Sequence, residues 1–318
     1  MALLTALPLA VARELGRSYG VDLVALEPLV AGSVNSNFRV RTSDGQLLFA
    51  RLYEEQGIDG AHTELSLLAD LAAAGVPVGK PLSPAGELPV LAGKPFVLFP
   101  WVTGDILCFE RTKAEACRQV GRALASVHLA GGRRTPLGPG RFGPAQMRAR
   151  LDGVERATSR AELLADVARV RGLYDRFLPL RDPALPAGIV HGDLFRDNVL
   201  WQGEEIAALL DFESAFHGPL VYDLLVTLSA WCYGDAFELA RVRAMVEGYA
   251  SVRPLSAAEV LAVPTEGALA CLRFATSRIT DFELRTPPGA RPARDFRRFL
   301  ARLDAIAGGA LAPAFAGI

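Results

Sequence analysis

The segment His191-Gly192-Asp193, with Asn198 five residues after Asp193 and Asp211 further along, constrains this chain more than any other feature. Asp193 and Asn198 are close enough in sequence to lie on one short loop. Two apolar runs follow, at 199–202 and 206–210, and they predict a hairpin that returns Asp211 to the side of that loop. The sequence therefore predicts one site at which two carboxylates and one amide converge.

Phosphoryl transfer from ATP to an alcohol uses this set of side chains. We assign Asp193 as the group that accepts or orients the hydroxyl proton of the acceptor. Asn198 and Asp211 are assigned as ligands of Mg²⁺, which prefers a few oxygen ligands together with substrate phosphates. His191 is grouped with the catalytic residues, as the one expected to brace the loop. The alternative, a surface loop with chance polar residues, requires all of these matches to be coincidental.

Asp223 lies near the start of a helix that is expected after Gly218-Pro219. A carboxylate is favoured at this position by the helix dipole and the free N–H groups of the first turn, which is enough to explain the residue. A second role for Asp223 is to brace the catalytic loop.

Composition excludes several classes of function. The chain has 318 residues, of which 51% are hydrophobic, and this is sufficient for two lobes. A formal net charge of -1 lacks the basic excess that nucleic acid or an anionic membrane would favour. The four cysteines are widely spaced, which is typical of reduced thiols in a cytosol. We expect a cytoplasmic protein with no nucleic-acid or membrane partner, and its oligomeric state stays open.

The hydrophobic periodicity changes near residue 100 and predicts an α+β fold of two lobes. Residues 1–100 are expected to form a small β-rich N-terminal lobe that binds nucleotide. Residues 101–318 are expected to form a larger, mostly helical lobe that holds the catalytic and substrate sites. Strands are expected at 21–30, 38–41, 47–53 and 96–99, and helices at 8–17, 62–74, 113–129, 161–178, 222–233 and 255–284.

A turn of small residues near the N-terminus, Gly32-Ser33-Val34-Asn35-Ser36-Asn37, lies between two expected strands. Backbone N–H groups in such a turn can bind phosphate, so Gly32, Ser33 and Asn35 are candidates for nucleotide contacts. The alternative is a turn that only joins the strands.

Arg51, on an expected strand, and Glu64, on the following helix, form a candidate pair. Kinases usually place a lysine at this strand position, where it contacts phosphate and a helix glutamate. Arginine can bridge phosphate oxygens, although its planar fork differs from a point charge. The alternative is that both side chains simply face solvent.

Residues 95–101 are a candidate hinge, in which the backbone of Leu98, Phe99 and Trp101 would hydrogen-bond the adenine edge. A buried strand explains this apolar run equally well.

Taken together, these motifs resemble the aminoglycoside phosphotransferase and choline kinase superfamily, and within it the bacterial homoserine kinases of kinase-like type. This resemblance implies a protein-kinase-like fold of two lobes. The resemblance covers nearly the whole chain in order. It implies ATP-dependent phosphorylation of the side-chain hydroxyl of L-homoserine in threonine biosynthesis, with Asp193 as base and Asn198 and Asp211 as Mg²⁺ ligands. Arg51 departs from the superfamily's usual lysine. The stretches that carry the likeness are 32–38, 75–77, 191–200, 221–231 and 273–278.

A zwitterion such as homoserine needs a cation for its carboxylate and acceptors for its ammonium group. Arg278 and Asp281, three residues apart on a late helix, are candidates, or else an ordinary surface pair. Asn37 and Trp231 are further candidates for substrate contacts.

Three other functions stay open. A choline kinase would need an aromatic box, for which Trp101, Trp231 and Tyr233 are available. An aminoglycoside kinase would need an acidic pocket, and the arginine-rich C-terminal half opposes it. A nucleotide-binding protein with a degenerate site is supported only by Arg51.

Overall fold

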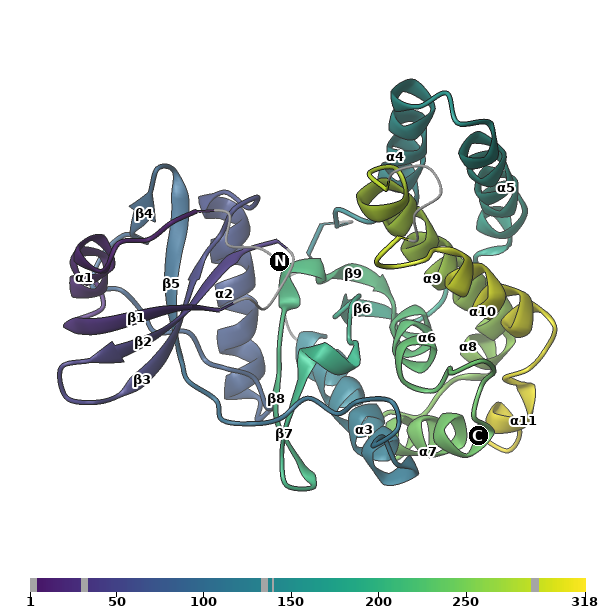
Figure 1. The fold of residues 1–318 in the computed structure, drawn as a ribbon. Coiled ribbons are helices and arrows are strands. Elements are labelled where there is room, and N and C mark those ends of the chain that lie inside the picture. Colours follow the sequence, from purple (N-terminus) through teal and green to yellow (C-terminus); the bar gives the residue numbers. More distant parts are fainter. Residues whose placement is uncertain (1–4, 30–33, 133–136, 139, 287–291) are drawn as a thin grey trace. The chain divides into compact units, whose positions relative to one another are not determined.

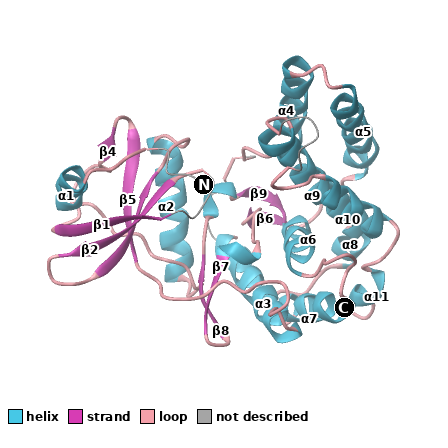
Figure 2. Ribbon diagram, viewed as in Figure 1, coloured by secondary structure: helices cyan, strands magenta, loops and turns pink. Residues whose placement is uncertain are grey.

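A computed structural model describes residues 5–29, 34–132, 137–138, 140–286 and 292–318 (Figure 1). The chain divides into two compact units. The sheet unit comprises residues 1–105, 200–203 and 207–210, and the helical unit comprises 106–199, 204–206 and 211–318. Long strands belong to the first unit and most helices to the second (Figure 2), so the predicted α+β class is confirmed.

The sheet unit is built on five antiparallel strands in the order β1-β2-β3-β5-β4. Alternate side chains of two central strands point into the core, including Phe38 and Val40 of β2 and Leu48 and Ala50 of β3. This period of two follows from the pleat of a strand, in which successive side chains point to opposite faces of the sheet. The strands are β1 (Leu23–Leu29), β2 (Ser36–Thr42), β3 (Leu47–Leu52), β4 (Val90–Leu91) and β5 (Lys94–Pro100).

Two helices flank this sheet, on opposite sides of it in Figure 1. Helix α1 (Leu9–Arg17) contributes Ala12 to the cluster formed by Phe38, Val40 and Leu48. Helix α2 (Ile58–Ala73) buries a face that carries Glu64 together with leucines. Burying a carboxylate is costly unless it is paired, so this placement of Glu64 requires a partner.

A second, two-stranded sheet is formed by β7 (Val199–Gln202) and β8 (Glu205–Leu209), which confirms the predicted hairpin. Asp105 and Trp201 exchange backbone hydrogen bonds of 2.8 and 2.9 Å. Leu209 donates its N–H to the carbonyl of Pro77. The hairpin is therefore bonded to the sheet unit, whereas the residues before and after it, including Asn198 and Asp211, belong to the helical unit.

The helical unit surrounds α6 (Leu220–Trp231), every residue of which is buried. A helix that is buried on all sides, and mostly apolar, fits such a central position. A short pair of antiparallel strands, β6 and β9, leads into it. The other elements are α3 (Ala114–Gly131), α4 (Pro144–Ala157), α5 (Ala161–Phe177), β6 (Ala187–Val190), β9 (Phe216–Pro219), α7 (Leu239–Ala250), α8 (Ala257–Leu261), α9 (Val263–Arg278), α10 (Arg297–Ala307) and α11 (Ala312–Phe315).

The prediction of one long helix at 255–284 is wrong. Ser256 and Glu259 form a capping box at the start of α8. Pro264 has no N–H group to donate to the preceding turn, so α9 begins anew at Val263. Beyond Arg278 the backbone widens into a π-helical turn at Ile279–Glu283. Within the described residues, no helix combines the length and apolar character that a bilayer crossing requires.

Helices α3 and α7 approach each other through two glycines. A Cβ atom added at Gly121 would lie 2.2 Å from the carbonyl oxygen of Met245, and one added at Gly248 would lie 2.1 Å from that of Arg118. Both glycines are therefore required by backbone-to-backbone contact, which no side chain can relieve by moving.

Gly248→Ala is expected to lower the free energy of unfolding by about 3 kcal/mol, because the added methyl group forces two backbones apart. Urea unfolding followed by circular dichroism measures this change. The matched control is Gly172→Ala on α5, where nothing lies within 4 Å of the added Cβ. Alanine there is expected to stabilise the helix by up to about 1 kcal/mol. Unchanged stability of the Gly248 variant would contradict the close approach.

Candidate active site

The loop that carries Asp193 begins where β6 ends. Gly192 adopts a φ of 75°, in the left-handed region that favours glycine. A Cβ atom there would lie 2.9 Å from the carbonyl oxygen of Ser214. Gly192 thus lets the Asp193 loop pack directly against the segment that follows Asp211.

Asn198 is tied to the loop by its amide. Its Nδ2 donates to the main-chain carbonyl of Asp193 at 2.8 Å, and its N–H donates to the carbonyl of Phe195. Because the amide nitrogen is used in this way, Oδ1 is the atom of Asn198 that can coordinate a cation. The structure therefore brings Asp193 and Asn198 together on one loop.

Asp211 adopts a φ of 63°, which is unusual for a residue with a side chain. Such strain persists only where the surroundings hold it, and it is concentrated at functional sites. The next residue, Phe212, packs its ring 4.4 Å from the ring of His191. Asp211 therefore turns back beside the catalytic loop.

The oxygens of Asn198 and Asp211 fit Mg²⁺ better than a soft metal. Within the described residues, no group of three or more His, Cys, Asp or Glu side chains could hold a metal alone. One amide and one carboxylate oxygen suit an ion that takes its other ligands from phosphates and water.

Asp223, which is expected to brace the loop together with His191, is fully buried. Its Oδ2 accepts the N–H of His191 at 2.6 Å, and its Oδ1 accepts the N–H of Gly192 at 2.8 Å. Burial opposes ionisation of Asp223, but the hydrogen bond and charge of His128, with those of the loop, hold its pKa below the ordinary value. The bracing role predicted for Asp223 is confirmed.

A buried chain of hydrogen bonds extends from Asp223 to α7. His128 Nε2 lies 3.0 Å from Oδ2 of Asp223, and His128 Nδ1 lies 2.7 Å from the hydroxyl of Tyr249. Because an ionised Asp223 can only accept, Nε2 of His128 donates to it. Arg253 in turn donates to the Tyr249 hydroxyl. Helices α3, α6 and α7 thus hold the loop jointly.

Asp193 itself is partly exposed, with 29% of its side chain accessible. Burial raises its pKa, the Arg273 guanidinium opposes that rise, and the carboxylate of Asp211 adds to it. Nη1 of Arg273 donates to Oδ1 of Asp193 at 3.2 Å. Sequence reasoning did not assign Arg273 a role. The sequence signal that could have identified Arg273 is a charged residue within the apolar run of α9.

In the sheet unit, Arg51 lies beside both Glu64 and Asn37. Its Nη1 is 3.5 Å from Oε1 of Glu64, and its Nε is 3.4 Å from Oδ1 of Asn37. Arg51 and Asn37 are also paired across β2 and β3. Glu64, which is 5% exposed, therefore has the partner that its burial requires.

The end of the small-residue turn is held by a polar cluster. Oδ1 of Asn35 accepts the N–H of Glu54, and the Glu54 carboxylate accepts from Ser36, Thr5 and Lys94. Val34 and the residues after it are described, whereas Gly32 and Ser33 lie outside the described residues.

The expected hinge lies on β5. Leu98 is fully buried and its carbonyl accepts the N–H of Leu82. The ring of Phe99 packs 6.0 Å from that of Phe49. Trp101 follows the strand, and the guanidinium of Arg39 lies 5.9 Å from its ring.

Within the part of the chain that the structure describes, the three candidate substrate residues of the helical unit, Trp231, Arg278 and Asp281, each bond to a different partner and not to one another. Trp231 is fully buried, and its indole N–H donates to the carbonyl of Leu194. Arg278 donates to the carbonyl of Asp295 and packs on Phe299. Asp281 accepts from Arg150 rather than from Arg278.

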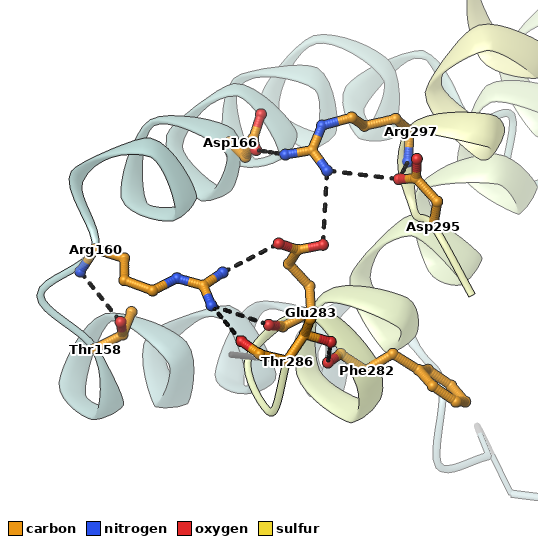
Figure 3. A network of polar contacts seen from close by, with 8 residues as sticks. All are labelled: Thr158, Arg160, Asp166, Phe282, Glu283, Thr286, Asp295 and Arg297. Atoms are coloured by element: carbon orange, nitrogen blue, oxygen red, sulfur yellow. Dashed lines mark hydrogen bonds and ion pairs between the residues drawn. The ribbon is translucent and has the colours of Figure 1, made fainter. Parts of the chain in front are cut away.

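A polar network surrounds the π-helical turn that contains Asp281 (Figure 3). Arg160 donates to the carbonyls of Glu283 and Thr286 and to the carboxylate of Glu283. Arg297 bridges Glu283 to Asp166. These contacts satisfy carbonyls that the end of the helix leaves without N–H partners.

Comparison with known proteins gives a consistent result. Residues 25–255 match the phosphotransferase enzyme family. A homoserine kinase of Methylocella silvestris is 39% identical over 281 residues, which cover 84% of this chain and 83% of the relative. A homoserine kinase of Rhizobium etli is 34% identical, covering 85% and 84%. A structure of the amicoumacin kinase hAmiN with AMP-PNP, Ca²⁺ and Ami has a TM-score of 0.68 at 18% identity, covering 89% and 88%.

Asp223→Asn is expected to lower the unfolding free energy at pH 7 by about 3 kcal/mol, since the loop N–H groups and His128 lose a charged acceptor. The folded-state pKa of Asp223 lies below its unfolded value. Its contribution is therefore present above pH about 4 and lost as pH falls through the folded pKa.

Unfolding free energies measured between pH 7 and pH 3 test this point. The variant is expected to show a shallower loss of stability in acid than the unmodified protein. Asp304→Asn, at a carboxylate whose side chain is 63% exposed, is the matched control and should leave the slope unchanged. Parallel pH curves for the Asp223 variant and the unmodified protein would refute the assignment.

Proposed function

The chain belongs to the phosphotransferase enzyme family and is a small-molecule kinase, and we propose that it transfers the γ-phosphoryl group of ATP to the side-chain hydroxyl of L-homoserine. The product would be O-phospho-L-homoserine, an intermediate on the route to threonine. The observation that carries this proposal is the 39% identity to a relative named homoserine kinase, over 84% of the chain.

In this proposal Asp193 receives the acceptor. Its carboxylate hydrogen-bonds the substrate hydroxyl, orients it for in-line attack and takes up its proton as the new O–P bond forms, while the bond from the γ-phosphorus to the bridging oxygen breaks and ADP leaves. The Asp223 carboxylate holds the main chain of His191 and Gly192, so Asp193 needs little reordering before reaction.

Asn198 Oδ1 and the Asp211 carboxylate would hold Mg²⁺, which supplies neutralisation of the triphosphate charge when bound. The hydrogen bond from Asn198 to the Asp193 carbonyl links this ligand to the base. The strained backbone of Asp211 fixes the second ligand. Both roles depend on residues of one unit.

The nucleotide is assigned to the sheet unit. Arg51 would contact phosphate oxygens in place of the usual lysine, with Glu64 as its ionic partner. Asn35 and the turn before it would cover the phosphates, and residues 98–101 would receive the adenine. A cytoplasmic location is part of the proposal, because all four cysteines are free thiols.

A substrate panel is the direct test. ADP release with Mg-ATP is expected to be fastest with L-homoserine, and slower with L-serine, choline or an aminoglycoside, because two of the three aromatic residues available for a choline box are buried. A coupled assay measures the rate for each alcohol. Faster turnover of choline or an aminoglycoside would sink the homoserine assignment.

The two acidic residues are expected to behave differently. Asp193→Asn should lower kcat by roughly 100-fold or more while the KM for ATP stays nearly constant. Asp211→Ala should instead raise the KM for Mg-ATP by roughly tenfold or more, since a metal ligand is lost. Steady-state kinetics separate the two effects.

Asp197→Asn is the matched control, because Asp197 is an exposed carboxylate on the same loop with no role in the proposal. It should retain most of the activity. Near-normal turnover of Asp193→Asn would show that the base is misassigned.

A further inference from the structure

Arg273 is almost completely buried, with 6% of its surface exposed. Its Cζ lies 3.9 Å from the ring centre of Phe142 and 3.8 Å from that of Phe274. Stacking of this kind restricts a guanidinium to hydrogen bonds in its own plane. The orientation of this guanidinium is therefore fixed between the two rings, unlike that of an ordinary surface arginine.

Among the residues that the structure describes, most of the hydrogen-bonding capacity of this guanidinium is unused. An arginine carries five N–H donors. Within the described residues, the guanidinium of Arg273 makes one hydrogen bond, from Nη1 to Oδ1 of Asp193. A buried arginine with donors to spare beside a catalytic carboxylate is suited to bind an anionic group of the substrate.

The chemistry of the proposed acceptor requires a cation at this place. Its hydroxyl must reach Asp193, and its carboxylate is only a few bonds away from that hydroxyl. The cation that binds the carboxylate must therefore lie next to Asp193. Arg273 meets this requirement, whereas Arg278 donates to the carbonyl of Asp295.

We propose that Arg273 binds the α-carboxylate of the hydroxy amino acid acceptor in its guanidinium plane while one N–H orients Asp193. Arg273 is then the residue that selects an alcohol with a carboxylate over one that lacks this group. The inference rests on the proposed homoserine kinase function and adds the group that recognises the substrate.

The test compares L-homoserine with 3-amino-1-propanol, which is homoserine without its carboxylate. We expect the unmodified enzyme to prefer homoserine by roughly 100-fold in kcat/KM, as a desolvated charge pair allows. Arg273→Met should remove most of this preference, because the methionine keeps apolar contact with the two rings but no charge. Arg273→Lys should retain part of it, since a lysine supplies one point charge.

Arg302→Met is the matched control. Arg302 is 7% exposed and packs on Tyr233 and Phe299, but it donates to the carbonyls of Ser229 and Arg298. Loss of this arginine should leave the preference for homoserine unchanged. The KM for ATP, measured for every variant, confirms that the fold and the nucleotide site are intact.

The possible results separate the two proposals. If Arg273→Met slows both alcohols equally and keeps the 100-fold preference, Arg273 acts only through Asp193 and the carboxylate assignment is wrong. If Arg273→Met does not fold, the same decision rests on Arg273→Gln, which also lacks the charge and whose unchanged preference would overturn the assignment. If the unmodified enzyme does not phosphorylate homoserine at all, the proposed function itself fails, and the role of Arg273 fails with it.

Discussion

The buried carboxylate of Asp223 is the interaction on which the catalytic loop depends. An unpaired charge in the interior would be strongly destabilising, so Asp223 can be ionised only because the loop N–H groups and His128 surround it. The same contacts specify where the loop goes. His128 is itself hydrogen-bonded to Tyr249 of α7. A continuous chain of hydrogen bonds therefore connects α7 to the catalytic loop.

The two proposed metal ligands are positioned by the backbone more than by their own side-chain contacts. Asn198 is held through its amide nitrogen, which directs its oxygen outward. Asp211 adopts an unfavourable φ, and the packing of Phe212 on His191 holds the backbone in this conformation. The close contact between Gly192 and Ser214 joins these two parts, and it tolerates no side chain at position 192.

Prediction from sequence succeeded where a local pattern decides the structure. The hairpin at β7 and β8, the strands β2 and β3 and the helix α5 form nearly where the periodicity predicts them. The pairing of Arg51 with Glu64 also follows from a spacing between a strand and the next helix. Helices α4 and α7 are not predicted, since many of their residues are charged or small and tertiary contacts stabilise them. The break between α8 and α9 depends on one proline.

The sequence by itself determined the family, the order of the elements and the identity of the residues proposed for catalysis, because these are encoded in short segments with characteristic spacing. Only the tertiary structure decided which distant residues meet them. Asp223 lies 32 residues from His191, and Arg273 lies 80 residues from Asp193. No periodicity relates such positions. It is the packing of α6 and α9 in the helical unit that brings a buried carboxylate under the loop and a buried guanidinium beside its aspartate.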